Sequence, residues 1–137
     1  MKRLSRYRDV GVLVIRLAFG FQLVRVSYTN ALFPAENIPN FVSYLISLGV
    51  PFPTVGAYLS SYTEFIGGIL LILGLFTRWT AVFLIINFSV AFGLAHVSIG
   101  DTYQNTFPSL NLLAVSIFLL LNGPGQFSVK NDERKTG

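Results

Sequence analysis

Four long apolar stretches follow one another along the chain, separated by polar or proline-containing breaks. They run approximately over residues 10–32, 55–76, 79–97 and 107–122. Each is close to the roughly 20 residues that a helix needs to cross a bilayer. The pattern therefore predicts an all-α chain that crosses a membrane four times as an antiparallel four-helix bundle.

The break after the first stretch contains a fifth, shorter pattern. Residues 39–49 are predicted to form a short amphipathic helix, because Pro39 suits a first helical turn and Gly49 suits the C-terminal end. Its apolar positions fall on one face: Phe41, Val42, Leu45 and Ile46. A helix of this length cannot span a bilayer. We expect it to lie in the outer interface or to cover the mouth of the bundle.

Composition agrees with a membrane protein and excludes other classes. Of 137 residues only 12% are charged and 53% are hydrophobic, whereas a typical soluble domain is about 25% charged. So small a soluble domain would have to expose large apolar patches. Disorder is excluded by the high apolar content. Nucleic-acid binding is not expected, because the net charge is only +4 and no basic stripe is present.

The length fits a single domain. We expect a basic N-terminus over residues 1–9, one membrane domain over residues 10–125 and a polar tail over residues 126–137. The chain has no cysteine, which excludes disulfides, thiolate nucleophiles and cysteine metal sites.

The distribution of basic residues predicts the orientation. Eight of the ten Lys and Arg residues fall in the N-terminal segment, at Arg78 between the second and third stretches, or in the C-terminal tail. The two remaining loops, over residues 33–54 and 98–106, contain none. Because cytoplasmic loops carry an excess of Lys and Arg, both termini are predicted to be cytoplasmic.

Ionisable side chains at membrane depth are costly, so they are the first functional candidates. Arg16, Arg25 and Glu64 lie within the stretches, and His96 lies near the end of one. At 1.5 Å per residue, Arg25 is about 8 Å and Glu64 about 14 Å below the outer surface of the core. Arg16 and Arg25 lie on opposite sides of their helix. Either Arg could therefore pair with Glu64, but both cannot face the same groove.

Polar neighbours extend this cluster. Gln22 shares the face of Arg25, Asn111 falls in the outer third with His96, and Tyr62 lies deep enough to line a pocket. Gln22, Asn111 and Asn87 also suit hydrogen bonds between helices. The cluster is thus either structural or a polar pocket open to the outside. A metal site is not expected, since His96 is the only histidine. Small residues beside Glu64, at Gly67 and Gly68, favour close helix approach.

The sequence of residues 64–78, Glu-Phe-Ile-Gly-Gly-Ile-Leu-Leu-Ile-Leu-Gly-Leu-Phe-Thr-Arg, resembles the DoxX family of small bacterial membrane proteins. Supporting matches are Arg-Leu-Ala-Phe-Gly at 16–20, Gly-Val-Pro-Phe-Pro at 49–53, and Gly-Pro-Gly at 123–125 followed by Ser128. The resemblance implies a four-helix protein of the bacterial inner membrane. The family often has a Gly and then a Lys where Ser27 and Asn30 stand here. At these two positions the first stretch of this chain departs from the usual family pattern.

Two functions follow from these observations. The family includes relatives of the small subunit of thiosulfate:quinone oxidoreductase, so the resemblance implies a redox-associated membrane subunit that contacts quinone, here through Arg25, Glu64 and His96. With no electron carrier of its own, such a subunit needs a redox partner protein. The alternative is a non-enzymatic protein that holds a lipid, a small molecule or a partner protein, with a structural Arg–Glu pair. A transporter is disfavoured by the lack of inverted repeats. No catalytic motif is present, and whether the chain acts alone or as a homo-oligomer stays open.

Overall fold

The computed structural model describes residues 2–5, 7–94 and 102–128, and all regular structure in these residues is helical. The helices, in chain order, are α1 (Lys2–Ser5), α2 (Arg8–Leu32), α3 (Pro34–Ser47), α4 (Pro53–Leu73), α5 (Thr77–Phe92) and α6 (Tyr103–Asn122). The four predicted apolar stretches correspond to α2, α4, α5 and α6, which confirms the all-helical fold class.

Two of these helices, α2 with 25 residues and α4 with 21, are long and apolar enough to cross a membrane. The shorter apolar helices are α5 and the part of α6 from Phe107 to Asn122. Large apolar side chains lie exposed on all of them, with Leu121 75% and Trp79 70% exposed. A soluble monomer rarely exposes extended apolar surface, so the outside of the molecule is compatible with lipid.

The short helix in the first loop is present, but its predicted start at Pro39 was wrong. Helix α3 begins at Pro34 and contains Pro39 in its interior. Pro34 can occupy the first turn because the N–H that it lacks has no partner there. The side chain of Asn37 reaches back to the carbonyls of Thr29 and Phe33, at 3.1 and 3.0 Å, and joins α3 to the end of α2. The helix ends at Ser47, two residues before the predicted end, and Gly49 follows its C-cap Leu48 with a positive φ of 77°.

Helices α2 and α4 pack closely along their length, and their backbones meet at two glycines. A Cβ on Gly20 would lie 2.8 Å from the carbonyl oxygen of Gly68, and a Cβ on Gly68 would lie 2.7 Å from that of Gly20. No real side chain fits at such distances. The expected close approach at the small residues of α4 is therefore confirmed, and its partner on α2 is Gly20.

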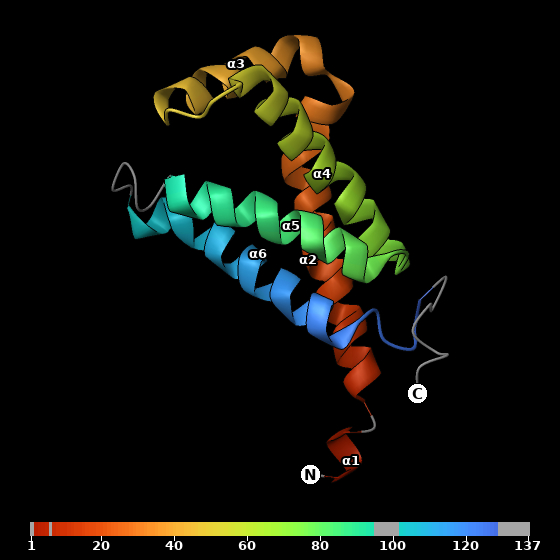
Figure 1. Cartoon of the computed structure of the whole chain (residues 1–137). Coiled ribbons are helices and arrows are strands. Elements are labelled where there is room, and N and C mark those ends of the chain that lie inside the picture. The colour runs from red at the N-terminus through yellow and green to blue at the C-terminus, as the bar shows by residue number, and fades with distance from the viewer. Residues whose placement is uncertain (1, 6, 95–101, 129–137) are drawn as a thin grey trace.

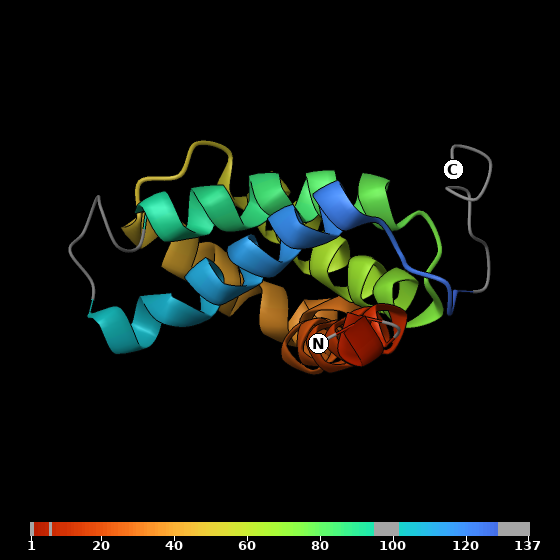
Figure 2. The same ribbon diagram turned by 90° about the horizontal axis from the view of Figure 1, so that it is seen from below.

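Figures 1 and 2 show two pairs of helices, with α3 lying across one end of the α2–α4 pair and α5 running beside α6. In both views the α5–α6 pair crosses α2 steeply. The four helices share one core, formed by Val12, Leu23, Leu71, Ala81, Leu84, Phe88 and Leu119. The antiparallel four-helix bundle stays a prediction.

Candidate functional site

Glu64 projects from α4 toward α5 and is half-buried. Its Oε1 accepts a hydrogen bond of 3.1 Å from Nδ2 of Asn87 on α5. Asn87 was expected to bond between helices, and this contact confirms it. Among the described residues neither Arg16 nor Arg25 pairs with Glu64, because each contacts other groups. The expected Arg–Glu pair is thus replaced by a Glu–Asn pair.

Arg25 lies on the exposed side of α2. Its guanidinium carbon is 5.4 Å from the centroid of the Tyr28 ring, in a cation–π contact three residues further along the same helix. The side chain therefore lies along α2, against Tyr28. Gln22 is also exposed on α2, consistent with the face that the spacing predicted.

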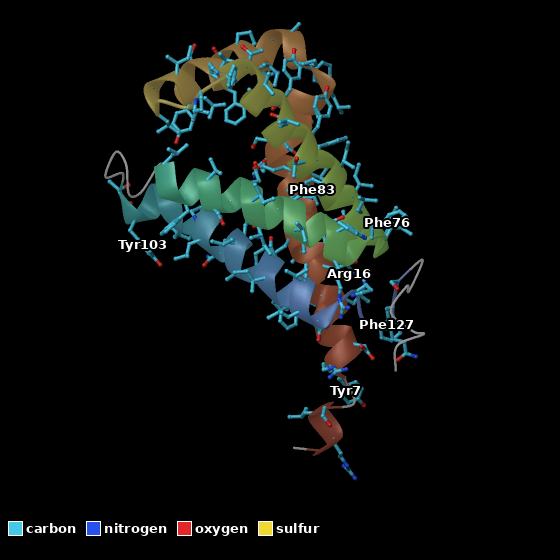
Figure 3. All side chains as sticks on the ribbon, in the orientation of Figure 1. Tyr7, Arg16, Phe76, Phe83, Tyr103 and Phe127 are labelled. Atoms are coloured by element: carbon cyan, nitrogen blue, oxygen red, sulfur yellow. The ribbon has the colours of Figure 1, made fainter. Side chains whose placement is uncertain are left out.

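Arg16 is almost completely buried, with 1% of its surface exposed. Its Nε donates to the carbonyl of Leu71 at 2.9 Å, and Nη2 donates to that of Ile72 at 3.2 Å. Its Nη1 donates to the carbonyl of Pro124 at 2.8 Å and also to that of Phe127. Figure 3 shows Arg16 and Phe127 near each other, at the end of the molecule where α4 and α6 finish. One guanidinium thus joins α2, α4 and the chain after α6.

The termination of α4 explains why a cation is stable in this position. The last carbonyls of a helix have no partner within it, and the helix dipole favours positive charge at that end. Arg16 supplies donors to two of these carbonyls. Gly74 ends α4 with a φ of 76°, and a Cβ there would lie 3.0 Å from Nη2 of Arg16 and 2.5 Å from Cβ of Ser128. Only glycine fits, and we conclude that Arg16 is a structural clamp.

The segment that Arg16 holds, residues 123–128, also contacts the start of α2. The backbone N–H of Gln126 donates to Oδ1 of Asp9 at 3.3 Å. From the sequence, Gly123, Pro124 and Gly125 were interpreted as the end of the fourth stretch and as part of the family resemblance, without a structural role. In the structure they belong to a strap between Asp9 and Arg16, and three of the segments that carried the family resemblance, at Arg16, at Leu71–Gly74 and at residues 123–128, meet at this point.

Tyr62 lies on α4 and holds that helix to the end of α2. Its hydroxyl donates to the carbonyl of Ala31 at 2.8 Å. The Tyr62 ring stacks on that of Tyr58, with centroids 6.3 Å apart and planes 7° apart. Both rings lie in the wall of a groove.

The groove lies between α4 and α5 and has a volume of about 450 Å³. Helix α4 contributes residues spaced three or four apart, and α5 contributes the opposite wall, including Phe83, which Figure 3 marks on that helix. The lining is Tyr58, Leu59, Tyr62, Thr63, Ile66, Gly67, Leu70, Thr80 and Phe83. Its only polar side-chain groups are hydroxyls. The sequence predicted Tyr62 as a residue that could line a pocket but did not predict the groove, whose α4 wall is marked by the i, i+4 repeat of Tyr58, Tyr62, Ile66 and Leu70.

The structure does not gather the predicted polar cluster at one site. Asn111 is exposed on α6, and Gln22 and Arg25 are exposed on α2. His96 lies outside the described residues. In the part of the chain that the structure describes, no three His, Cys, Asp or Glu side chains are arranged to hold a metal ion. Among the described residues, the apolar groove between α4 and α5 offers room for a ligand.

Comparison with known proteins gives one match. The DoxX family model matches residues 11–97, which is more than half of the chain and includes both Arg16 and Glu64. Helix α6 and the strap lie beyond the matched range. No curated protein matches the chain, and no solved structure does. The match confirms the resemblance read from residues 64–78: the chain belongs to the DoxX family.

Proposed function

We propose that this DoxX-family chain is a multi-pass protein of the bacterial inner membrane, with four crossings and both termini in the cytoplasm. The apolar α2 and α4 support the membrane location. The absence of Lys and Arg from the loops over residues 33–54 and 98–106 supports the orientation. The hydrogen bond between Asp9 and Gln126 also supports it, because it brings the start of α2 beside the chain that follows α6.

Within the membrane, the chain acts as a quinone-linked subunit that holds an isoprenoid quinone in the groove between α4 and α5. The observation that carries this proposal is the groove itself, about 450 Å³ in volume and lined by apolar groups with a few hydroxyls. Ligand pockets commonly have about 300–1,000 Å³ and combine apolar walls with a small number of polar groups. A quinone ring with an isoprenoid tail has the matching chemistry.

The quinone contact is assigned to the groove rather than to Arg25, Glu64 and His96. Arg25 is directed onto Tyr28, and Glu64 is engaged by Asn87. Their part is structural: the Glu64–Asn87 bond fixes α5 against α4 and so sets the distance between the groove walls. Because the chain has no cysteine, the electrons that reduce a bound quinone would come from a partner protein at the membrane surface.

A second candidate is a non-enzymatic protein that holds a lipid chain in the same groove. The observation that favours it is the absence of any charged side chain from the groove lining. Apolar walls bind an acyl chain as readily as an isoprenoid tail. The two functions share the site and differ in the molecule that occupies it.

Purification in mild detergent, followed by solvent extraction and absorption spectroscopy, tests which molecule is bound. A quinone should be recovered in near-stoichiometric amount, and added decylubiquinone should raise the thermal midpoint of quinone-depleted protein. The variant Thr63→Phe fills the groove and should lose both properties. Leu73→Phe, on the same helix but outside the lining, should keep them. Recovery of phospholipid alone, with no response to decylubiquinone, would refute the quinone function and support lipid binding.

A further inference from the structure

Thr80 lines the groove, and its buried hydroxyl has no hydrogen-bond partner among the described residues. Thr80 on α5 is 5% exposed, and its Oγ1 forms no hydrogen bond with any described residue. The carbonyl one turn earlier, at Phe76, accepts the backbone N–H of Thr80 at 2.9 Å but not its hydroxyl. A buried polar group without a partner is unfavourable, so a ligand in the groove would supply what the protein lacks.

The methyl group of Thr80 packs closely against α4. Gly67 faces it from α4, and a Cβ on Gly67 would lie 3.2 Å from Cγ2 of Thr80. Any larger residue at this position would therefore press on the threonine. The glycine therefore lets the two walls of the groove come close together at Thr80.

The position of Thr80 along the helix predicts the orientation of the ligand. Thr80 is the fourth residue of α5, about 5 Å from the start of the helix. The exposed Trp79 beside it is typical of a membrane interface. From Leu70 the groove follows α4 for twelve residues to Tyr58, about 18 Å. A polar head at Thr80 would thus lie near the cytoplasmic interface, with an apolar tail running toward the opposite side.

We propose that Oγ1 of Thr80 donates a hydrogen bond to a carbonyl oxygen of the quinone ring, and that the isoprenoid tail lies along α4 toward Tyr58. This assignment rests on the proposed quinone function and specifies the polar contact and the direction of binding. Of the two unpartnered threonines of α5, Thr80 is the one whose side chain lines the groove. Thr77, one turn earlier, is 3% exposed and also unpartnered among the described residues, but it does not line the groove.

Thr77 therefore provides a matched control. The affinity of quinone-depleted protein in detergent is measured for decylubiquinone and for decylbenzene, which has a ring and a tail but no carbonyl. Thr80→Val should weaken decylubiquinone binding about 2- to 12-fold, the range expected for one net hydrogen bond, and leave decylbenzene binding unchanged. Thr77→Val should change neither affinity, and Thr80→Ser should retain most of the affinity for decylubiquinone. The ligand-free Thr80→Val protein should be at least as thermally stable as the wild type, because it loses no internal bond.

The outcomes separate this inference from the function on which it rests. If wild-type protein does not bind decylubiquinone, the quinone function fails. If wild type and Thr80→Val bind it equally, the function stands and the assignment of Thr80 is wrong. The assignment is also overturned if Thr80→Val weakens decylbenzene equally, or if Thr77→Val causes the same loss, because either result would indicate a general disturbance of α5.

Discussion

Replacement of Arg16 by methionine should strongly destabilise the protein. Methionine keeps much of the buried length of the side chain and removes its four hydrogen bonds to carbonyls of α4 and the strap. The bonds to Leu71 and Pro124 are fully buried, whereas those to Ile72 and Phe127 are partly buried. A buried carbonyl left without a donor costs about 1–3 kcal/mol. Counting only the two buried carbonyls, we expect a loss of about 2–6 kcal/mol.

Arg16→Lys tests whether the charge or the geometry matters. Lysine retains the positive charge that the ends of α4 and the strap favour, but its single ammonium cannot match the planar fork that reaches carbonyls in different directions. We therefore expect Arg16→Lys to fall between wild type and Arg16→Met. Equal stability of Arg16→Lys and wild type would show that charge alone accounts for the effect.

Arg25→Met on the same helix is the matched control. Arg25 is exposed, and its contact with Tyr28 is worth about 0.5–1 kcal/mol at an exposed site. Free energies of unfolding in detergent micelles, with thermal midpoints as an independent measure, provide the comparison. The clamp interpretation is refuted if Arg16→Met lies within 1 kcal/mol of wild type, or if Arg25→Met is equally destabilising.

Two further substitutions test the contacts between helices. Gly68→Ala places a Cβ 2.7 Å from the carbonyl oxygen of Gly20, so α2 and α4 must separate. It should cost about 1–3 kcal/mol in unfolding experiments, whereas Gly11→Ala, with nothing within 4 Å, should have little effect. Asn87→Leu removes the donor to Glu64 and should cost about 1–3 kcal/mol, part of which the double variant with Glu64→Leu should restore. Additive losses in that double variant would contradict a direct bond.

The positions of the helices could be predicted because each is a long apolar stretch with a break at its ends. The errors occur where tertiary contacts decide the boundary. The second stretch stays apolar as far as Phe76, but α4 ends at Leu73, since Gly74 adopts a positive φ beside Arg16 and Ser128. Helix α3 begins earlier than predicted, where Asn37 bonds back to α2. Neither contact is visible in a local pattern.

The faces and depths of polar residues were also accessible from the sequence, but their partners were not. Spacing placed Arg16 and Arg25 on opposite sides of one helix, and the structure has one buried and one exposed. Depth suggested a carboxylate partner for an arginine. A guanidinium can be satisfied equally by unpaired backbone carbonyls, and those at the end of α4 and in the strap are closer to Arg16. Sequence spacing cannot distinguish these two kinds of acceptor.

The polar residues inside the helices therefore have two different tasks. Arg16 satisfies the backbone where α4 and the strap end, and the Glu64–Asn87 bond joins the two helices that form the groove. Both are internal contacts that hold the walls of the groove in place. Thr80, whose buried hydroxyl is unpartnered among the described residues, differs because its side chain lines the groove, where a bound molecule would lie. In a membrane, water cannot readily form hydrogen bonds with a buried polar group. An unpartnered hydroxyl in the lining of an apolar groove therefore indicates a ligand site better than a charged residue that already has partners within the protein. Ligand binding by this DoxX-family chain is therefore to be tested at Thr80 and the groove rather than at Arg16, Arg25 and Glu64.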